Sequence, residues 1–368
     1  MSRDNPEGLR ENFRAQPFWN PTKVHEHERD VLVHQMDLNE CPYPPSDKVI
    51  AAIAAAASNL NRYPDGTCPQ LTEHLSHSTG VPVENICWGA GSTQLLTAAA
   101  QIAVDSKDEL VVPGIVWRRF AGVFQALDAD VVEVANQADG SIDVDGLLGA
   151  IGNRTRLVVV LTPNNPTGLM LSGEELHALA TGVPENVLLF IDEAYHEFAI
   201  FAGGADPLPI LQEHRQGPWV VTRTFSKAYA LAGLRLGYVL ASSEEIANAI
   251  RLTTSTFNLA GVAEAAALAA LDDPGYTRMI LERNAEESTR IKQGLKRMGL
   301  DVMDSVTNFI SFDAKRPAGE LVHQLRARRI RVATWGYEAH GTWMRVSTGL
   351  PEDTDALLAA LEDILATS

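Results

Sequence analysis

TFSKAYALAGLRLGY, residues 224–238, places a lysine, an arginine and several hydroxyl groups between two apolar runs. The runs are Trp219–Val221 before it and Tyr238–Leu240 after it, which predicts a loop between two buried strands. Ionised side chains are seldom buried unless another group pairs with them. The pattern therefore predicts that Lys227 and Arg235 meet a ligand at this loop.

A ligand that fits this loop carries both an anionic group and an aldehyde. Lys227 would form a Schiff base with the aldehyde, while Thr224, Ser226 and Arg235 would hold a phosphate. Pyridoxal 5′-phosphate has both groups. A lone lysine after a serine would be an ordinary surface residue, so the prediction rests on the whole pattern S-K-x-x-x-L-A-G-L-R-x-G.

The composition indicates a globular protein that is not built to bind nucleic acid. The chain has 368 residues, 45% of them hydrophobic and 21% charged, which is enough sequence for two domains. Its formal net charge of −17 is opposite to the clustered positive charge that binds nucleic-acid backbones. The polar start of the sequence does not resemble a secretory signal and no apolar run reaches membrane-spanning length, so we expect a cytoplasmic protein.

Cysteine and histidine usage indicates neither disulfides nor a metal site. Cys41, Cys68 and Cys87 lack CxxC spacing, and their odd number favours reduced thiols. His25, His27 and His34 form a loose group without a Cys or carboxylate cluster at ligand spacing, so no metal is expected.

Strand-like apolar runs alternate with helix-length segments between Ile86 and Leu240. This alternation predicts an α/β fold with a mostly parallel, mixed sheet covered by helices. A helical stretch from about Ser243 to Gly299, interrupted near Pro274, leads to strands of a smaller α+β unit. We therefore expect three parts: an N-terminal arm (1–30), a large cofactor-binding domain (61–250) and a small domain (31–60 and 251–368).

Polar residues follow several of the predicted strands, where ligands bind in parallel sheets. Gly89–Gln94 opens a helix and includes Ser92 and Thr93, so it predicts an anion site, although such a turn can be purely structural. Trp117 follows the next strand and is the candidate to stack on a cofactor ring. A plain core role for Trp117 stays open, with Phe120 as the second candidate.

Three further strand ends complete the predicted site. Asn165, in T-P-N-N-P-T-G, would donate its amide hydrogen to the phenolate oxygen of the ring, unless the segment is only a turn. Asp192 would hold a protonated pyridine nitrogen, or else cap a helix or act as a paired structural carboxylate, and Tyr195 would share the ring oxygen. Arg345, in a strand of the small domain, would bind a substrate carboxylate or form a structural salt bridge.

These residues together resemble the class II aminotransferases of fold type I, and most closely the histidinol-phosphate aminotransferase family. The resemblance spans about residues 37–350 and rests on N-E-C-P, R-Y-P-D, G-A-G-S-T-Q, N-N-P-T-G, D-E-A-Y, S-K-A-Y-A-L-A-G-L-R-L-G, N-F-I and M-R-V-S-T-G. It implies pyridoxal phosphate on Lys227, the roles given above for the other residues, an amino donor and a 2-oxo acid as substrates, and a homodimer. Tyr63 would reach across the dimer interface to the partner's cofactor phosphate.

The chain differs from the family pattern at three places. N-E-C-P stands where N-E-N-P is common, Trp117 stands where the stacking residue is usually Tyr or Phe, and Thr93-Gln94 stands where Asp-Glu is common. These differences concern the substrate, and an amino acid of specialised metabolism stays open. Two other functions also stay open: that of a related pyridoxal-dependent decarboxylase, lyase or oxidase, and that of a ligand-sensing relative that is not an enzyme.

Overall fold

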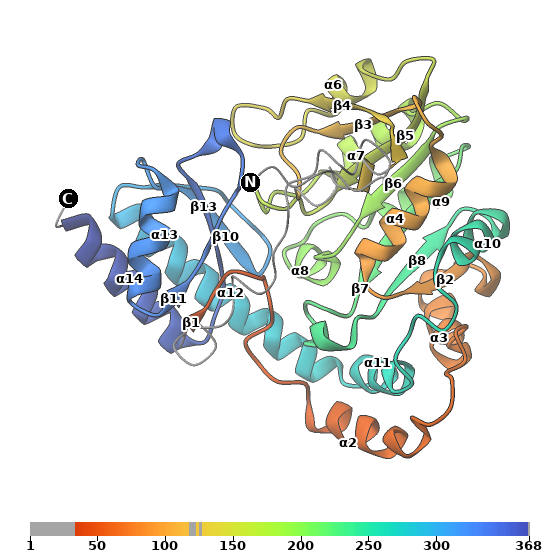
Figure 1. Cartoon of the computed structure of the whole chain (residues 1–368), viewed down its shortest axis with the longest axis horizontal. Helices are drawn as coiled ribbons and strands as arrows, with labels where there is room; N and C mark the ends of the chain where they lie inside the picture. The colour runs from red at the N-terminus through yellow and green to blue at the C-terminus, as the bar shows by residue number, and fades with distance from the viewer. Residues whose placement is uncertain (1–33, 118–122, 125–126, 367–368) are drawn as a thin grey trace, which may run out of the picture.

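A seven-stranded sheet forms the centre of the larger part of the molecule, in a computed structural model that describes residues 34–117, 123, 124 and 127–366 (Figure 1). The strand order is β2-β8-β7-β6-β5-β3-β4, and every strand but β8 runs in the same direction. Their bounds are β2 Ile86–Gly89, β3 Glu109–Pro113, β4 Asp130–Val134, β5 Thr155–Leu161, β6 Leu188–Asp192, β7 Trp219–Thr224 and β8 Gly237–Ala241. The predicted mostly parallel, mixed sheet is confirmed.

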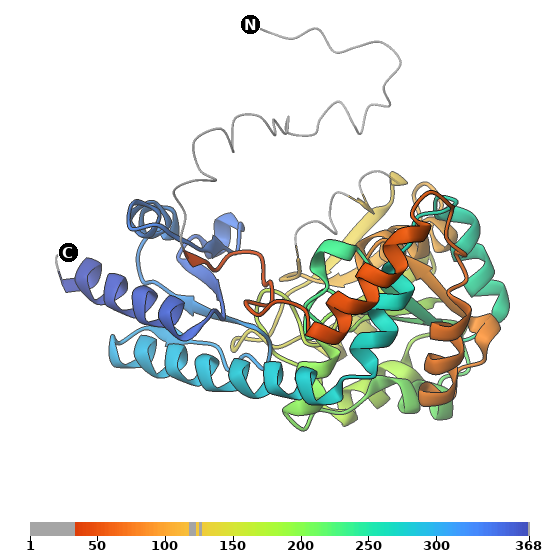
Figure 2. The ribbon, with the colours of Figure 1, turned by 90° about the horizontal axis from the view of Figure 1, so that it is seen from below.

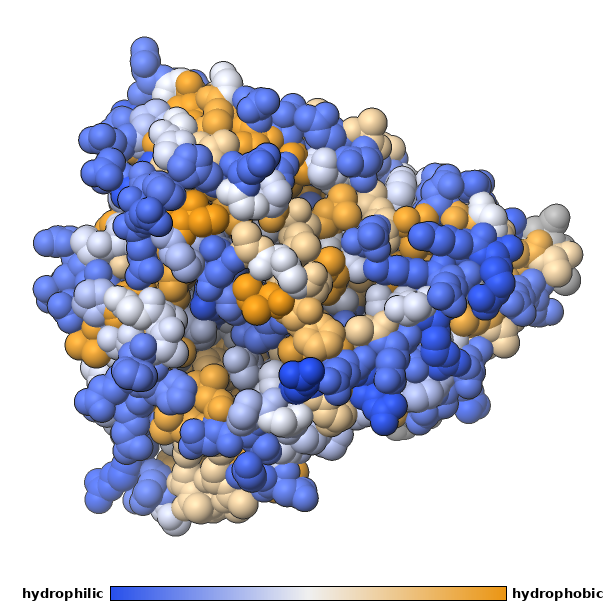
Figure 3. Space-filling model, turned by 180° about the vertical axis from the view of Figure 1, so that it is seen from behind, coloured by the Kyte–Doolittle hydropathy of each residue, from blue (hydrophilic) through white to orange (hydrophobic). Residues whose placement is uncertain are grey.

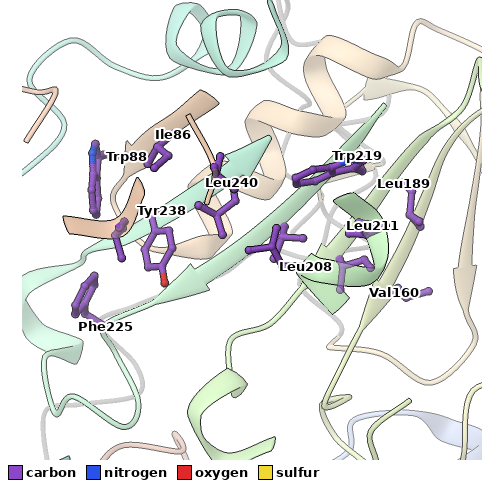
Figure 4. Close-up of a cluster of buried hydrophobic side chains, with 14 of the residues drawn as sticks. Ile86, Trp88, Val160, Leu189, Leu208, Leu211, Trp219, Phe225, Tyr238 and Leu240 are labelled. Carbon is purple, nitrogen blue, oxygen red and sulfur yellow. The ribbon is translucent and has the colours of Figure 1, made fainter. Parts of the chain in front are cut away.

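The central strands are apolar throughout because both faces of the sheet are covered. In β5, Val158 and Val160 face one buried cluster, while Leu157, Val159 and Leu161 face another. Figure 4 shows part of the first cluster, in which Trp219, Leu240 and Leu208 lie together. The helices on the first face are α2 Asp47–Ala56, α3 Pro69–Thr79, α6 Val144–Gly149, α7 Gly173–Gly182, α9 Pro207–His214 and α11 Ala263–Leu271; those on the second are α4 Ser92–Ala103 and α10 Glu244–Thr253.

A smaller unit packs beside the large sheet, as predicted. Its four-stranded antiparallel sheet has the order β12-β13-β10-β9, and a two-stranded sheet pairs β1 with β11. The long helix α12 (Pro274–Arg297) runs along both units (Figure 2). The other elements are β1 His34–Gln35, β9 Asp301–Val302, β10 Phe309–Asp313, β11 Ile330–Arg331, β12 Ala333–Thr334, β13 Trp343–Ser347, α8 His196–Phe201, α13 Ala318–Ala327 and α14 Pro351–Ala366.

The packing bears on the domain ranges expected from sequence. Val49 of α2 and the alanines of α11 belong to the buried cluster of the large sheet, whereas Met36 belongs to the cluster of the small unit. We therefore propose that 46–60 and 251–271 pack as part of the large domain, and that the small domain takes the remainder of its expected ranges. The arm 1–30 lies outside the described residues.

The helical stretch predicted for 243–299 contains a second interruption that the sequence analysis missed. Residues 254–262 separate α10 from α11. Threonine and serine dominate the start of this segment, and their hydroxyl groups compete for backbone hydrogen bonds, which weakens a helix. Helical geometry ends at Thr254, whose ψ is 156°, and the positive φ of 58° at Phe257 keeps the segment from returning to a helix there.

Three further features bear on the expectations from sequence: the surface, possible membrane-spanning helices and the histidine group. The face in Figure 3 is mostly hydrophilic, with apolar residues in separate patches. Among the described residues, no helix combines the length and apolar character needed to cross a membrane. Nδ1 of His34 lies 2.6 Å from a carboxylate oxygen of Asp353; His25 and His27 lie outside the described residues.

Candidate active site

The carboxyl ends of β2, β3, β5, β6 and β7 surround one cavity of about 410 Å³, which Arg345 of β13 and the segment Leu38–Glu40 also line. The residues predicted for the site come from distant segments and meet here because parallel strands end at the same edge. Those that line the cavity are Ser92, Thr93, Trp117, Asn165, Asp192, Tyr195, Thr224, Ser226, Lys227, Arg235 and Arg345. Phe120, the second stacking candidate, lies outside the described residues.

Lys227 is held in the cavity by main-chain oxygen atoms. Its amine donates hydrogen bonds to the carbonyl oxygens of Asn39 (2.8 Å) and Leu38 (3.3 Å). Burial, helped by the nearby charge of Arg345, lowers the pKa of this amine from 10.5 to about 8. The amine therefore loses its proton far more readily than an exposed lysine, as a nucleophile toward an aldehyde must.

Asp192 lies at the end of β6 and is 7% exposed. Its Oδ1 accepts hydrogen bonds from the Ala194 amide (3.0 Å) and the Thr222 hydroxyl (3.3 Å), which leaves Oδ2 for a ligand. Burial raises the pKa of this carboxyl group to about 6, so a cationic partner would stabilise its ionised form. The alternative of a helix cap is not what the structure has, because the residue that precedes α8 as its N-cap is Tyr195.

Two amide groups and a phenol meet on one wall of the cavity. The Asn165 Oδ1 accepts a hydrogen bond from Arg345 (2.7 Å), so its Nδ2 faces the Tyr195 hydroxyl at 3.5 Å. Asn39 donates its Nδ2 to the same hydroxyl at 2.8 Å. Burial raises the pKa of Tyr195 to about 12, which keeps the phenol protonated as a donor. This wall can therefore donate hydrogen bonds to an anionic oxygen of a ligand.

Arg345 has no carboxylate partner within the described part of the chain. Besides Asn165, its guanidinium donates to the carbonyl oxygen of Asp37 (2.7 Å), while its buried Nε has no partner among those residues. The Asp37 carboxylate instead pairs with Arg331 at 2.7 Å. The alternative of a structural salt bridge is therefore wrong, and an anionic ligand would supply what this buried cation lacks.

A cradle for an anion lies at the other end of the cavity. Ser92 and Thr93 are the first residues of α4, whose first-turn amides have no partners inside the helix. Arg235 donates to the Ser226 hydroxyl (3.3 Å), which lies 3.0 Å from that of Thr224. Gly91 has a φ of 85°, and a Cβ there would collide with the Arg235 guanidinium. Because Gly91 has no Cβ, the guanidinium of Arg235 can lie beside the N-terminus of α4.

Tyr63 is the predicted site residue that does not line the cavity. Its side chain is 79% exposed and stacks on Phe257, with 4.3 Å between the ring centroids. Within one chain it therefore lies apart from the other site residues.

Asn39 is a site residue that the sequence analysis missed. Its carbonyl oxygen accepts from Lys227 and from Asn308, its side chain donates to Tyr195, and its amide donates to the Ser347 hydroxyl at 2.8 Å. A positive φ of 54° allows these contacts, and Asn adopts such a conformation more readily than most residues. The turn-rich segment around N-E-C-P was the available signal.

A buried ion-pair network lies beside the cavity. Arg223 donates hydrogen bonds at 2.8 Å to the carboxylates of Glu193 and Asp206, and Glu193 also lies 2.8 Å from Nδ1 of His196. Burial alone would raise the pKa of Glu193, but Arg223 and His196 reverse the shift and lower it. Glu193, His196 and Asp206 are close enough for a metal site, yet the guanidinium already binds both carboxylates.

Replacing Arg223 with methionine should lower the free energy of unfolding by about 3–5 kcal/mol, because Glu193 and Asp206 would keep their charges without this partner. Urea unfolding followed by circular dichroism measures the change. Arg278→Met is the matched control, since it breaks an exposed pair with Glu282 and should cost about 0.5 kcal/mol or less. Equal losses in the two variants would contradict the argument; if Arg223→Met does not fold, Arg223→Lys gives the comparison.

The donor set fits a phosphorylated aromatic aldehyde. The cradle suits a phosphate, Lys227 suits the aldehyde, and the free oxygen of Asp192 suits a protonated ring nitrogen. The indole of Trp117 lines the cavity and also packs against the core of the large sheet, so a core role does not exclude the stacking role predicted for it. Pyridoxal 5′-phosphate, expected from the sequence, therefore fits the residues that the structure brings together.

Comparison with known proteins gives one consistent result. A model of the family described as aminotransferase class I and II matches residues 33–361. The chain is 34% identical over 353 residues to histidinol-phosphate aminotransferase 2 of Carboxydothermus hydrogenoformans, covering 95% of this chain and 96% of that protein. It is 33% identical over 327 residues to histidinol-phosphate aminotransferase of Bacillus subtilis (strain 168), covering 89% of this chain and 90% of that protein.

Solved structures agree with these relatives. The structure of histidinol-phosphate aminotransferase from Sinorhizobium meliloti in complex with pyridoxal-5′-phosphate superposes with a TM-score of 0.90 at 28% identity and covers 98% of each chain. Aspartate aminotransferase from Thermus thermophilus with maleate has a TM-score of 0.81 at 23% identity, over 92% of each chain, which supports the fold alone.

Proposed function

The chain belongs to the class I and II aminotransferase family, and on that premise we propose that it moves an amino group from histidinol phosphate, or from an aromatic amino acid, to a 2-oxo acid. It is an aminotransferase of fold type I that uses pyridoxal 5′-phosphate. The observation that carries the proposal is the meeting of Lys227, Asp192 and Arg345 in one cavity beside an anion cradle.

The cofactor would be held at four points. Thr224, Ser226 and Arg235, with the first residues of α4, would bind its phosphate; Trp117 would lie against its ring. Asp192 would keep the ring nitrogen protonated, and the amide of Asn165 with the Tyr195 hydroxyl would donate to the ring oxygen. When bound, the group supplies an aldehyde that takes up the substrate's amino group and a ring that accepts electrons from the bond that breaks.

Lys227 would carry out the proton transfer at the substrate. Its amine, with a pKa lowered by burial to about 8, would accept the proton from Cα of the amino donor and hold it for return to the bound substrate. The carbonyl oxygens of Leu38 and Asn39 hold this amine in the cavity while it is free. Arg345 would grip the carboxylate, or the equivalent polar end of an amino-alcohol phosphate, and so hold Cα within reach.

A half-reaction tests the transfer directly. We expect the yellow enzyme to lose its visible absorbance when mixed with the right amino donor, and to regain it when a 2-oxo acid is added. Stopped-flow absorbance with histidinol phosphate and aromatic amino acids tested first would identify the donor. Release of CO₂ without conversion of the cofactor to its pyridoxamine form would contradict transamination and indicate a decarboxylase.

Arg345→Lys should raise KM for a donor with a carboxylate by about 10- to 100-fold, because a lysine cannot make the two parallel hydrogen bonds of a guanidinium. The value of kcat should change less, since the contact exists in the ground state as well. Steady-state kinetics measure both. Arg251→Lys, which alters an arginine bound to carbonyl oxygens near β2, is the control and should leave KM unchanged. An unchanged KM in Arg345→Lys would remove the assigned role.

We also infer a homodimer with shared sites. Tyr63, Phe257, Leu60 and Leu252 are large apolar residues between 51% and 80% exposed, and a second copy would cover them. Tyr63 would then reach the partner's cofactor phosphate, which explains why it lies outside the cavity of its own chain. Light scattering should give twice the mass of one chain; the mass of a single chain would contradict this part.

A further inference from the structure

The turn that carries Trp117 is anchored from three sides. This stacking turn, residues 113–117, has its Ile115 amide bound to Oδ1 of Asn136 (2.9 Å) and its Ile115 carbonyl oxygen bound to Nδ2 of Asn164 (2.9 Å). The hydroxyl of Tyr337 accepts a hydrogen bond from the Val116 amide (3.0 Å) and donates one to the Val116 carbonyl oxygen (2.5 Å). Both polar groups of the residue before Trp117 thus depend on one phenol.

Tyr337 comes from the small domain, 221 positions away from Val116 in the sequence. It lies in the β12–β13 loop, residues 335–342, which follows β12 and precedes the strand of Arg345. Trp335 of this loop stacks on Trp343, with 4.6 Å between ring centroids, and donates its indole hydrogen to the Ser311 hydroxyl at 2.9 Å. The loop is therefore a packed platform on which the Tyr337 hydroxyl has a defined position.

The small domain also contacts the turn that carries Asn165, through Ser311 of β10, the residue to which Trp335 donates. The Ser311 hydroxyl donates to the carbonyl oxygen of Pro166 at 2.5 Å, and Asn164 connects this turn to the stacking turn through Ile115. The two turns that follow β3 and β5 are thus joined to the small domain by Tyr337 and Ser311. Through them the part of the molecule that holds Arg345 is linked to Trp117 and Asn165, two of the residues that would contact the cofactor ring.

We propose that Tyr337 is a positioning residue, which holds the main chain of Val116 so that the indole of Trp117 stays against the cofactor ring. The proposal rests on the stacking role proposed above for Trp117. In the absence of the hydroxyl, the amide and carbonyl group of Val116 lose their partner, and the turn is free to relax away from the ring. Tyr337 itself does not line the cavity, so the proposal assigns its effect to the placement of Trp117, the lining residue next to Val116.

The test is a double-mutant cycle on cofactor affinity, which does not depend on turnover. The dissociation constant of pyridoxal phosphate is measured by absorbance for the wild type, Tyr337→Phe, Trp117→Leu and the double variant. We expect Tyr337→Phe to weaken binding roughly tenfold, since the two hydrogen bonds that it removes hold Val116 and affect the cofactor only through the placement of Trp117. The double variant should bind as weakly as Trp117→Leu alone, because one residue acts through the other.

Tyr276→Phe is the matched control. It removes a phenol that donates to the carbonyl oxygen of Pro44 at 2.6 Å, away from the cavity, and should leave the affinity unchanged. Thermal unfolding of the cofactor-free chains separates positioning from stability: Tyr337→Phe should melt within a few degrees of Tyr276→Phe.

The outcomes distinguish this inference from the function on which it rests. If Trp117→Leu alone leaves affinity unchanged, the stacking role fails. If Trp117→Leu weakens binding but Tyr337→Phe does not, or if the two effects multiply in the double variant, only the positioning role of Tyr337 is overturned.

Discussion

Replacing Lys227 with alanine is expected to slow amino-group transfer by more than about 10³-fold, since one side chain supplies both the nucleophile and the proton carrier. Single-turnover absorbance with a good donor measures the loss. Lys227→Arg is the matched control: it keeps a positive charge beside the carbonyl oxygens of Leu38 and Asn39 but offers no usable lone pair, so it should be equally inactive. Turnover within tenfold of wild type in either variant would refute the role.

The lowered pKa of Lys227 predicts a pH dependence for attachment of the cofactor. Only the neutral amine attacks an aldehyde, and its fraction rises as the pH passes through about 8 rather than through 10.5. The rate at which cofactor-free protein takes up pyridoxal phosphate should therefore increase between pH 7 and 9 and level off above, if the cradle binds the phosphate equally well over that range. Borohydride reduction and peptide mapping should place the added mass on Lys227.

Replacing Asp192 with asparagine is expected to reduce turnover by about 10²- to 10³-fold, because the ring nitrogen would lose a buried charged partner. The change preserves shape and the two hydrogen bonds to Oδ1, so the fold should be unaffected. Thr222→Val is the control: it removes one of those bonds but not the charge, and should cost about tenfold or less.

The raised pKa of Asp192 predicts how the affinity for pyridoxal phosphate changes with pH. In the cofactor-free chain this carboxyl group takes up a proton as the pH falls through about 6, which removes the charge that attracts the ring nitrogen. Wild-type affinity for pyridoxal phosphate should thus weaken below pH 6 more steeply than that of Asp192→Asn. Parallel pH profiles for the two proteins would show that the carboxylate does not face the ring nitrogen.

The chemistry of the site could be predicted from the sequence because charged residues stand in segments whose apolar character predicts burial. Lys227, Asp192 and Arg345 stand in or beside apolar runs that become buried strands, where an unpaired charge is costly. Strand ends of a parallel sheet meet at one edge, so Lys227 and Asp192 had to lie near each other. Arg345 belongs to the antiparallel sheet of the small domain, and only the packing of the two units brings it to the same cavity. The pattern of apolar runs was sufficient for the fold class and for many of the residues around the cavity, but it missed Asn39.

Other features were missed, although the Thr-Ser-Thr run at 254–256 and the turn-rich segment around Asn39 gave weak local signals for two of them. The second break in the helical stretch, the placement of α2 and α11 on the large sheet, and the contacts of Asn39 and Tyr337 were not predicted. The placement of α2 and α11 and the contacts of Asn39 and Tyr337 depend on how elements far apart in the chain pack together, and an asparagine in a turn or a tyrosine in a loop has many possible partners.

The amino-acid sequence by itself determined the layered α/β architecture, the phosphate-and-aldehyde chemistry of the site and the residues that would supply it. Only the tertiary structure decided which groups orient them: Asn39 over Lys227 and Tyr195, Arg345 on Asn165, and Tyr337 under the stacking turn. The physical reason is the distance along the chain over which each of these effects acts. Burial and periodicity act along a few neighbouring residues, whereas a hydrogen bond forms only when folding brings two atoms within about 3 Å of each other.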